Sequence, residues 1–235
     1  MDSTTERAAL PGPRESRAAL IYFALYMAYL FAARESELLH WLSLVAIPLV
    51  IVFALRPGNR SLRAILSSFG LRRGNLIKGV GWAMLLGTAF GVIQIFLSGN
   101  SAETQEAIRT GRALYLLPLG FALMMLLAGF TEEFFFRGFL QTRMEALFRS
   151  KWLAVLIVAL LFGIYHLPYA YFNPNWPSTG DWSAAWVAAL GNGVPGGLVL
   201  GVLYVKSNRN LLGCIVLHSM IGAFPAMTLL KFGGG

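Results

Sequence analysis

The chain has 235 residues, of which 57% are hydrophobic and only 13% are charged. A soluble domain carries about 45–50% apolar and about 25% charged residues, so this composition excludes an ordinary soluble enzyme and a disordered chain. The single cysteine, Cys214, excludes a disulfide-stapled secreted domain. In a chain this apolar, the formal net charge of +8 indicates basic loops beside anionic lipid and no nucleic-acid partner.

Seven apolar segments follow a mixed-charge N-terminal tail, residues 1–17, which is predicted to be cytoplasmic. The N-terminus does not resemble a signal peptide, and the first apolar segment is expected to be a retained anchor. The segments are 18–33, 38–55, 79–97, 116–140, 152–167, 184–205 and 211–230. Glycines in the third and sixth segments are typical of closely packed membrane helices. We predict an all-α, polytopic membrane bundle of about seven transmembrane helices, forming one membrane-embedded domain over 18–230.

The distribution of Lys and Arg predicts the orientation. With the N-terminus in the cytoplasm, 15 of the 19 basic residues fall in cytoplasmic pieces. The loop 56–78 alone holds six basic residues and no acid, which is typical of a loop lying on anionic headgroups. The segment 168–183 is expected to be an outer loop. We predict a multi-pass protein of the bacterial inner membrane.

Few ionisable side chains fall inside the apolar segments, and each is a functional candidate because charge is costly in lipid. They are Glu132, Glu133 and Arg137 in the fourth segment, His166 in the fifth and His218 in the seventh. A further histidine, His40, lies next to Trp41 close to an interface and is interpreted as structural.

The two adjacent glutamates are predicted to have different tasks. Neighbouring helical residues point about 100° apart, so Glu132 and Glu133 cannot face one direction. Glu133 and Arg137 are spaced i, i+4 with the acid first, which favours an ion pair. Glu133 is therefore expected to neutralise Arg137, which leaves Glu132 without a local partner. In the alternative, all three form one structural charge cluster.

Helix geometry predicts that Glu132, His166 and His218 lie at similar depths. Segments four and five form a hairpin that turns near Ser150. Glu132 precedes this turn by 18 residues and His166 follows it by 16, so their levels differ by only ~3 Å. The amphipathic stretch 141–150 is expected to project from the membrane. Glu132 then lies at a depth comparable to that of His218, which is about eight residues into segment seven. The three side chains are expected to converge in a cavity that opens toward the cytoplasm.

One carboxylate and two imidazoles suit the hydrolysis of a peptide bond. Glu132 can act as general base toward water, one histidine can hold that water, and the other can donate to the oxyanion. We expect no required cofactor. Glu132, His166 and His218 also match the ligands of a catalytic zinc site, which is the minority alternative. The H-E-x-x-H spacing of common zinc proteases is absent.

The same residues resemble the motifs of a known family. Glu132-Glu133-x-x-x-Arg137, then Phe162-x-x-x-His166, then His218 near the C-terminus are similar to three motifs of the CPBP (ABI) intramembrane proteases. This group includes CAAX prenyl endopeptidases and bacteriocin-processing and immunity proteins. The resemblance covers about half of the chain, with a motif core over 116–225.

The resemblance implies an all-helical membrane fold and a glutamate-activated water. It implies that Glu132 is the base, that His166 positions the water and that His218 assists at the oxyanion. Its supporting residues would be Glu133, Arg137 and Phe162.

One position departs from the family pattern. The third motif usually reads H-x-x-x-N, with the Asn as an oxyanion donor, but the fourth residue after His218 is Gly222. Losing one such donor typically costs about 10²–10³ in rate. Asn192, in the GNGVPGG break of segment six, could supply the amide, although a structural role is the simpler interpretation.

We predict an intramembrane endopeptidase that acts at the lipid bilayer on a peptide or protein substrate, of the CAAX type (prenylated substrates included) or a bacteriocin-like peptide. The alternative is a non-catalytic membrane interaction or immunity protein on the same fold. The missing Asn favours that alternative, whereas the intact Glu132, His166 and His218 oppose it. A proton-coupled transporter would predict inverted repeats, which the sequence lacks.

Overall fold

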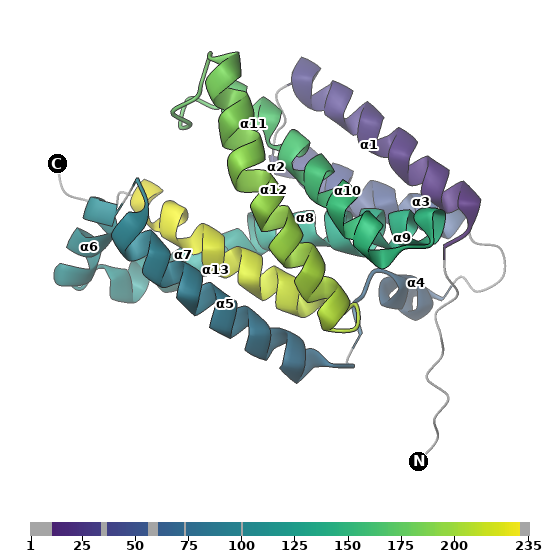
Figure 1. Cartoon of the computed structure of the whole chain (residues 1–235), viewed down its shortest axis with the longest axis horizontal. Coiled ribbons are helices and arrows are strands. Elements are labelled where there is room, and N and C mark those ends of the chain that lie inside the picture. The colour runs from purple at the N-terminus through teal and green to yellow at the C-terminus, as the bar shows by residue number, and fades with distance from the viewer. Residues whose placement is uncertain (1–10, 34–36, 56–60, 73, 100, 231–235) are drawn as a thin grey trace. The chain divides into compact units, whose positions relative to one another are not determined.

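The computed structural model describes residues 11–33, 37–55, 61–72, 74–99 and 101–230, and over these residues it is all-helical, as predicted (Figure 1). The first elements are α1 (Pro13–Ala33), α2 (Glu37–Trp41), η1 (Leu42–Ala46), α3 (Ile47–Leu55), α4 (Leu62–Ser68), α5 (Leu76–Leu97) and α6 (Ser101–Arg109). Next come α7 (Ala113–Met124), η2 (Met125–Gly129), α8 (Phe130–Glu133), η3 (Phe134–Gln141) and α9 (Thr142–Phe148). The last are α10 (Lys151–Tyr165), α11 (Leu167–Phe172), α12 (Trp182–Lys206) and α13 (Leu211–Leu229).

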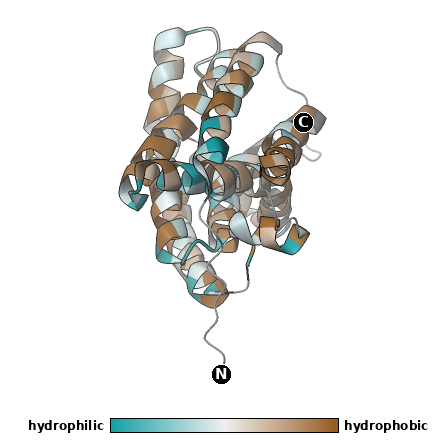
Figure 2. Cartoon of the chain, turned by 90° about the vertical axis from the view of Figure 1, so that its right-hand side faces the viewer, coloured by the Kyte–Doolittle hydropathy of each residue, from teal (hydrophilic) through white to brown (hydrophobic). Residues whose placement is uncertain are grey.

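All seven predicted apolar segments lie on helices, and four helical stretches are long and apolar enough to cross a membrane by length and composition. These four are Leu76–Leu97, Ala113–Phe148, Lys151–Phe172 and Trp182–Lys206. Large apolar side chains are widely exposed, among them Ile77 at 87% and Leu114 at 83%, and Figure 2 shows hydrophobic residues predominating along the helices. Such exposure is typical of a lipid-facing surface. Membrane crossing by the other three segments stays a prediction.

The described residues form two compact units that interleave along the sequence. Unit 1 comprises the residues up to Arg72 together with Phe134–Val202. Unit 2 comprises Arg73–Glu133 together with the residues from Leu203 onwards. Each unit therefore needs two separated stretches of chain to complete its core. The predicted single domain over 18–230 stays a prediction.

In unit 1, α10 and α12 approach to backbone contact. Small residues recur every four positions along the buried face of α12: Ala185, Ala189, Gly193, Gly197 and Gly201. A Cβ atom on Gly197 would lie 2.8 Å from the Cα of Ala159, and one on Gly193 would lie 2.7 Å from the Cα of Gly163. Membrane helices pack through such small residues, which confirms the packing role predicted for the glycines of segment six.

Unit 1 also contains a buried ion pair between α1 and α9. The Nη2 of Arg143 lies 3.2 Å from the Oε2 of Glu15, and both side chains are almost completely buried. The Ser16 hydroxyl donates to the Arg143 carbonyl at 2.9 Å. Helix α1 begins at Pro13, inside the predicted tail, because proline suits the first turn of a helix. Residues 13–17 thus belong to a packed helix.

In unit 2, α13 packs against α5 on one side and against α7 to α8 on the other. The buried residues of α5 are again small and spaced by four: Gly79, Ala83, Gly87 and Gly91. A Cβ atom on Gly213 of α13 would lie 2.7 Å from the Gly79 carbonyl oxygen, and one on Gly120 of α7 would lie 2.8 Å from the Ala223 carbonyl oxygen. This packing brings the middle of α13 beside α8.

Candidate active site

The fourth apolar segment is not a regular helix around its two glutamates. The four residues of α8, Phe130–Glu133, stand between two π-helical stretches, η2 before them and η3 after them. π-helical turns are uncommon and often occur at functional sites, because the wider turn redirects side chains relative to a regular α-helix. Nothing in the residue pattern predicts this irregularity.

Glu133 is hydrogen-bonded to His218 within unit 2. Its Oε1 lies 2.7 Å from the Nδ1 of His218, and the Glu133 side chain is fully buried. A carboxylate oxygen accepts, so Nδ1–H donates. This bond fixes the orientation and tautomer of the imidazole, because the remaining nitrogen, Nε2, must face elsewhere.

Glu132 lies at the other nitrogen of the same ring. Its Oε2 is 3.8 Å from the Nε2 of His218, close enough for an ion pair but too long for a direct hydrogen bond. The predicted equal depth of Glu132 and His218 is thereby confirmed. With Nδ1–H donated to Glu133, a neutral ring would present a lone pair to a carboxylate.

The contact between Glu133 and His218 is the feature that sequence reasoning missed. The i, i+4 spacing predicts Arg137 as the partner of Glu133, because spacing along one helix carries no information about α13. Arg137 is fully buried, its Nη2 donates to the Gly197 carbonyl at 3.2 Å, and its guanidinium lies 4.5 Å from the centre of the Phe162 ring. An additional ion pair between Glu133 and Arg137 stays a prediction.

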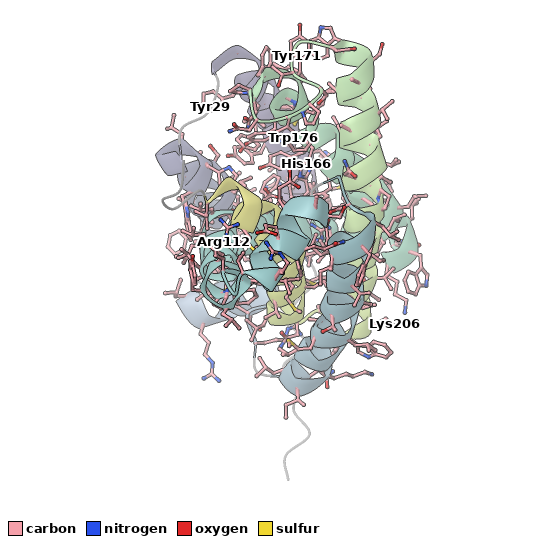
Figure 3. The ribbon with its side chains drawn as sticks, turned by 90° about the vertical axis from the view of Figure 1, so that its left-hand side faces the viewer. Tyr29, Arg112, His166, Tyr171, Trp176 and Lys206 are labelled. Carbon is pink, nitrogen blue, oxygen red and sulfur yellow. The ribbon has the colours of Figure 1, made fainter. Side chains whose placement is uncertain are left out.

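His166 lies at the C-terminal end of α10 in unit 1. Its Nδ1 is 2.7 Å from the Phe162 carbonyl oxygen, which accepts, so Nδ1–H donates. The Phe162 ring also meets the imidazole edge-on at 4.6 Å, as expected for residues on one helix face. In the neutral ring Nε2 then carries the lone pair and can accept a hydrogen bond. Figure 3 labels His166 together with Tyr171 and Trp176, which follow it in the chain.

The candidate residues are divided between the two units. Unit 2 brings Glu132 and Glu133 to the two nitrogens of His218. Unit 1 links Arg137 to Phe162 and Phe162 to His166. The convergence of His166 with Glu132 and His218 stays a prediction.

Residues 114–224, which contain all of these side chains, match the family model described as Rce1-like, type II CAAX prenyl endopeptidase. This segment belongs to that protease family. The match confirms the resemblance drawn from the three motifs. Together with the four apolar helices, it indicates an integral membrane protein. No curated protein and no solved structure matches the chain.

The position at which this family pattern usually has Asn is closed by a neighbouring side chain. A Cβ atom on Gly222 would lie 2.6 Å from the Cε of Met124 and 3.1 Å from its Cγ. Met124 ends α7, so its thioether fills the space that a longer side chain at position 222 would need. The second proposed donor, Asn192, lies exposed on α12 in unit 1.

The choice between a metal-free and a zinc-dependent protease is not made by the family assignment. Among the described residues, no group of three or more His, Cys, Asp or Glu side chains could hold a metal ion. Glu132 and His218 belong to unit 2 and His166 to unit 1. Zinc ligation by these three residues therefore stays an alternative prediction.

Proposed function

We propose that the chain is a glutamate-dependent endopeptidase that cleaves a membrane-tethered peptide of the CAAX type. The observation that best supports this proposal is that two carboxylates flank the His218 ring. Glu133 Oε1 lies 2.7 Å from Nδ1, and Glu132 Oε2 lies 3.8 Å from Nε2. Within a segment that belongs to a protease family, this arrangement supplies a carboxylate that can act as base and an oriented imidazole.

Glu132 takes a proton from water, and the water oxygen bonds to the scissile carbonyl carbon. When the carbon–nitrogen bond breaks, Glu132 returns that proton to the leaving amine. Each such transfer typically contributes about 10²–10⁴ in rate. His166 is proposed to accept a hydrogen bond from the water through Nε2, which the bond from Nδ1 to the Phe162 carbonyl leaves with the lone pair.

His218 stabilises the oxyanion in this mechanism. When its ring is protonated, Nε2–H donates to the developing negative charge and Nδ1–H stays on Glu133. The negative carboxylate of Glu133 stabilises the imidazolium, so Glu133 acts through His218. One oxyanion donor is typically worth about 10²–10³ in rate.

We place the N-terminus and the site opening on the cytoplasmic side of a bacterial inner membrane, because the Lys and Arg distribution favours that orientation. The family assignment favours a CAAX-type substrate over a bacteriocin precursor. The substrate would then carry a prenyl group on a cysteine close to its C-terminus, held in the same bilayer.

The proposal is tested with purified protein in lipid vesicles and a fluorescent peptide that ends in a prenylated Cys-a-a-X sequence. Wild type should cleave it, and Glu132→Gln should reduce cleavage by at least about 10²-fold. Glu106→Gln is the matched control: Glu106 is exposed on α6, and hydrogen bonds from Arg109 lower its pKa, so it also loses a charge. Equal cleavage by wild type and Glu132→Gln would contradict the mechanism.

Zinc is the alternative means of activating the water, and the same assay separates the two. Preincubation with a strong chelator should leave wild-type cleavage unchanged. Loss of cleavage that added Zn²⁺ restores would replace the metal-free mechanism with the zinc alternative.

A second candidate function is a non-catalytic membrane immunity or interaction protein on the same fold. The observation that favours it is Met124, which fills the space of the usual Asn donor. This function predicts that wild type and Glu132→Gln bind the prenylated peptide equally and that neither cleaves it.

A further inference from the structure

A polar side chain is exposed in the middle of a candidate membrane span. Asn192 lies ten residues after the start of α12 and fourteen before its end, which at ~1.5 Å per residue places it ~15 Å and ~21 Å from the two ends. Its side chain is exposed, and it makes no hydrogen bond to another described residue. A bare amide in hydrocarbon is unfavourable, so a hydrogen-bonding group is expected to cover it.

The backbone next to Asn192 is also altered. Pro195 lies inside α12 and has no amide hydrogen, so the Gly191 carbonyl, four residues earlier, loses its α-helical donor. Gly191 and Pro195 are exposed and Gly196 is partly exposed, and no described heavy atom lies within 4 Å of a Cβ position on either glycine. We refer to the Asn192 amide and the adjacent Gly191 carbonyl, which lacks an α-helical donor at position 195, as the polar notch of α12.

The polar notch lies next to the contact between α12 and the end of α10, close to His166. Gly193, the next residue, packs on α10, where a Cβ atom would lie 2.7 Å from the Gly163 Cα and 3.4 Å from the Nδ1 of His166. Asn192, Gly193 and His166 all belong to unit 1. A ligand on the polar notch would therefore lie close to the histidine that is proposed to hold the water.

We infer that the polar notch binds the backbone of an extended substrate peptide, so that Asn192 positions the substrate. A side-chain amide offers a donor and an acceptor, which match the carbonyl and N–H of one peptide unit, and the Gly191 carbonyl accepts a further N–H. A transmembrane helix cannot bind the polar notch through its backbone, because its N–H and C=O groups are already hydrogen-bonded within the helix. The inference rests on the proposed function, since the peptide is its substrate.

A second copy of the chain is the rival occupant, because two Asn192 amides could pair across a helix–helix interface. The two occupants can be distinguished by the groups that they require. Self-association through Asn192 occurs without any peptide, whereas binding of a substrate peptide depends on the backbone N–H groups of that peptide.

Binding is measured in the Glu132→Gln background, so that the prenylated fluorescent peptide stays intact. Asn192→Ala should weaken binding about tenfold, the loss of one or two hydrogen bonds. Pro195→Ala, which returns a helical donor to the Gly191 carbonyl, should also weaken it. Val199→Ala is the matched control, since Val199 is 42% exposed on the same helix and has no polar side-chain atom.

Ester-substituted peptides, each lacking one backbone N–H, identify the bond itself. One of these esters should bind the protein that has Asn192 less tightly than the all-amide peptide does. The same ester and the all-amide peptide should bind Asn192→Ala equally tightly. In the active background, Asn192→Ala should raise KM and leave kcat within about twofold.

Equal binding by Asn192→Ala and its parent would overturn the inference, as would loss of self-association without loss of peptide binding. A fall in kcat at constant KM would also overturn it and assign Asn192 to the oxyanion. If wild type cleaves nothing while the binding differences persist, the proposed function fails and the peptide site stands.

Discussion

At the scale of single residues, Glu132 and Glu133 lie at different nitrogens of the His218 ring and at different distances from it. In the proposed mechanism, Glu133, 2.7 Å from Nδ1 of His218, is a positioning group, whereas Glu132, 3.8 Å from Nε2, activates the water. The i, i+4 pattern of Glu133 and Arg137 does not reveal this, because it describes only neighbours on one helix. The partner of Glu133 comes from a helix that is 85 residues away in sequence.

The two roles predict different effects of Glu133 substitutions. Glu133→Gln keeps an oxygen that can accept from Nδ1–H but loses the charge that stabilises the imidazolium, so kcat should fall by at least about tenfold while the protein stays folded. Glu133→Leu also leaves a buried donor without an acceptor and should cost about 1–3 kcal/mol of stability. Vesicle cleavage and thermal unfolding measure the two effects. Unchanged kcat in Glu133→Gln would refute the positioning role.

Restoring the usual Asn of the family should depend on Met124. Gly222→Asn alone must displace the Met124 thioether and is expected to destabilise the fold by about 1–3 kcal/mol without raising turnover. With Met124→Ala the space opens, and the double variant should regain stability and raise turnover by up to about 10²-fold. Unfolding and cleavage assays on the single variants and the pair check this. A stable, active Gly222→Asn single variant would show that Met124 yields easily.

At the scale of elements, spaced small residues explain why α10 and α12 lie so close. The stripe on α12 is predictable from its sequence, and the structure adds which helix it meets. Helix α11 corrects the prediction of an outer loop over 168–183, because the Pro and aromatic residues after His166 form a short helix instead. Pro168 is accommodated in the first turn of α11, and Ala170 is fully buried with Ala185 of α12.

Two adjacent glycines on α12 should differ in their tolerance of a large side chain. Gly197→Leu would place its Cβ 2.8 Å from the Ala159 Cα and should destabilise unit 1 by at least about 1–3 kcal/mol. Gly196→Leu meets no described atom within 4 Å and should leave the melting temperature almost unchanged. Similar melting temperatures for the two variants would argue against close α10–α12 packing.

The buried ion pair between α1 and α9 should contribute strongly to the stability of unit 1. Arg143→Leu would leave the Glu15 carboxylate buried without its cation, at a cost of about 3–5 kcal/mol. Arg109→Leu is the control, since its partner Glu106 is exposed and should tolerate the loss. Thermal unfolding in detergent compares them. Equal losses would mean that the α1 contact contributes little to the fold.

At the scale of the whole molecule, composition was sufficient to predict an all-helical membrane protein, and the three motifs were sufficient to place its central segment in a protease family. The π-helical turns around α8, the Glu133–His218 bond and the Glu15–Arg143 pair were not predicted. The two side-chain pairs join distant parts of the chain, about which helical periodicity carries no information.

The charge distribution makes a prediction about the topology of the whole chain. In a Cys214→Ser background, a cysteine at position 67 should be protected from an impermeant thiol reagent in intact cells, and a cysteine at position 179 should be labelled. Position 67 lies in the basic region between α3 and α5, and position 179 lies in the α11–α12 connection. Labelling at 67 with protection at 179 would reverse the proposed orientation.

The proposed mechanism requires that Glu132 and His166 act on one water molecule. The most direct test is kcat/KM for cleavage of the prenylated peptide by wild type, Glu132→Gln, His166→Ala and the double variant. Groups that act as a unit are strongly non-additive, so the double variant should be no slower than the slower single variant, within about threefold. Losses that multiply in the double variant would show that the two residues act independently and would contradict the shared catalytic site.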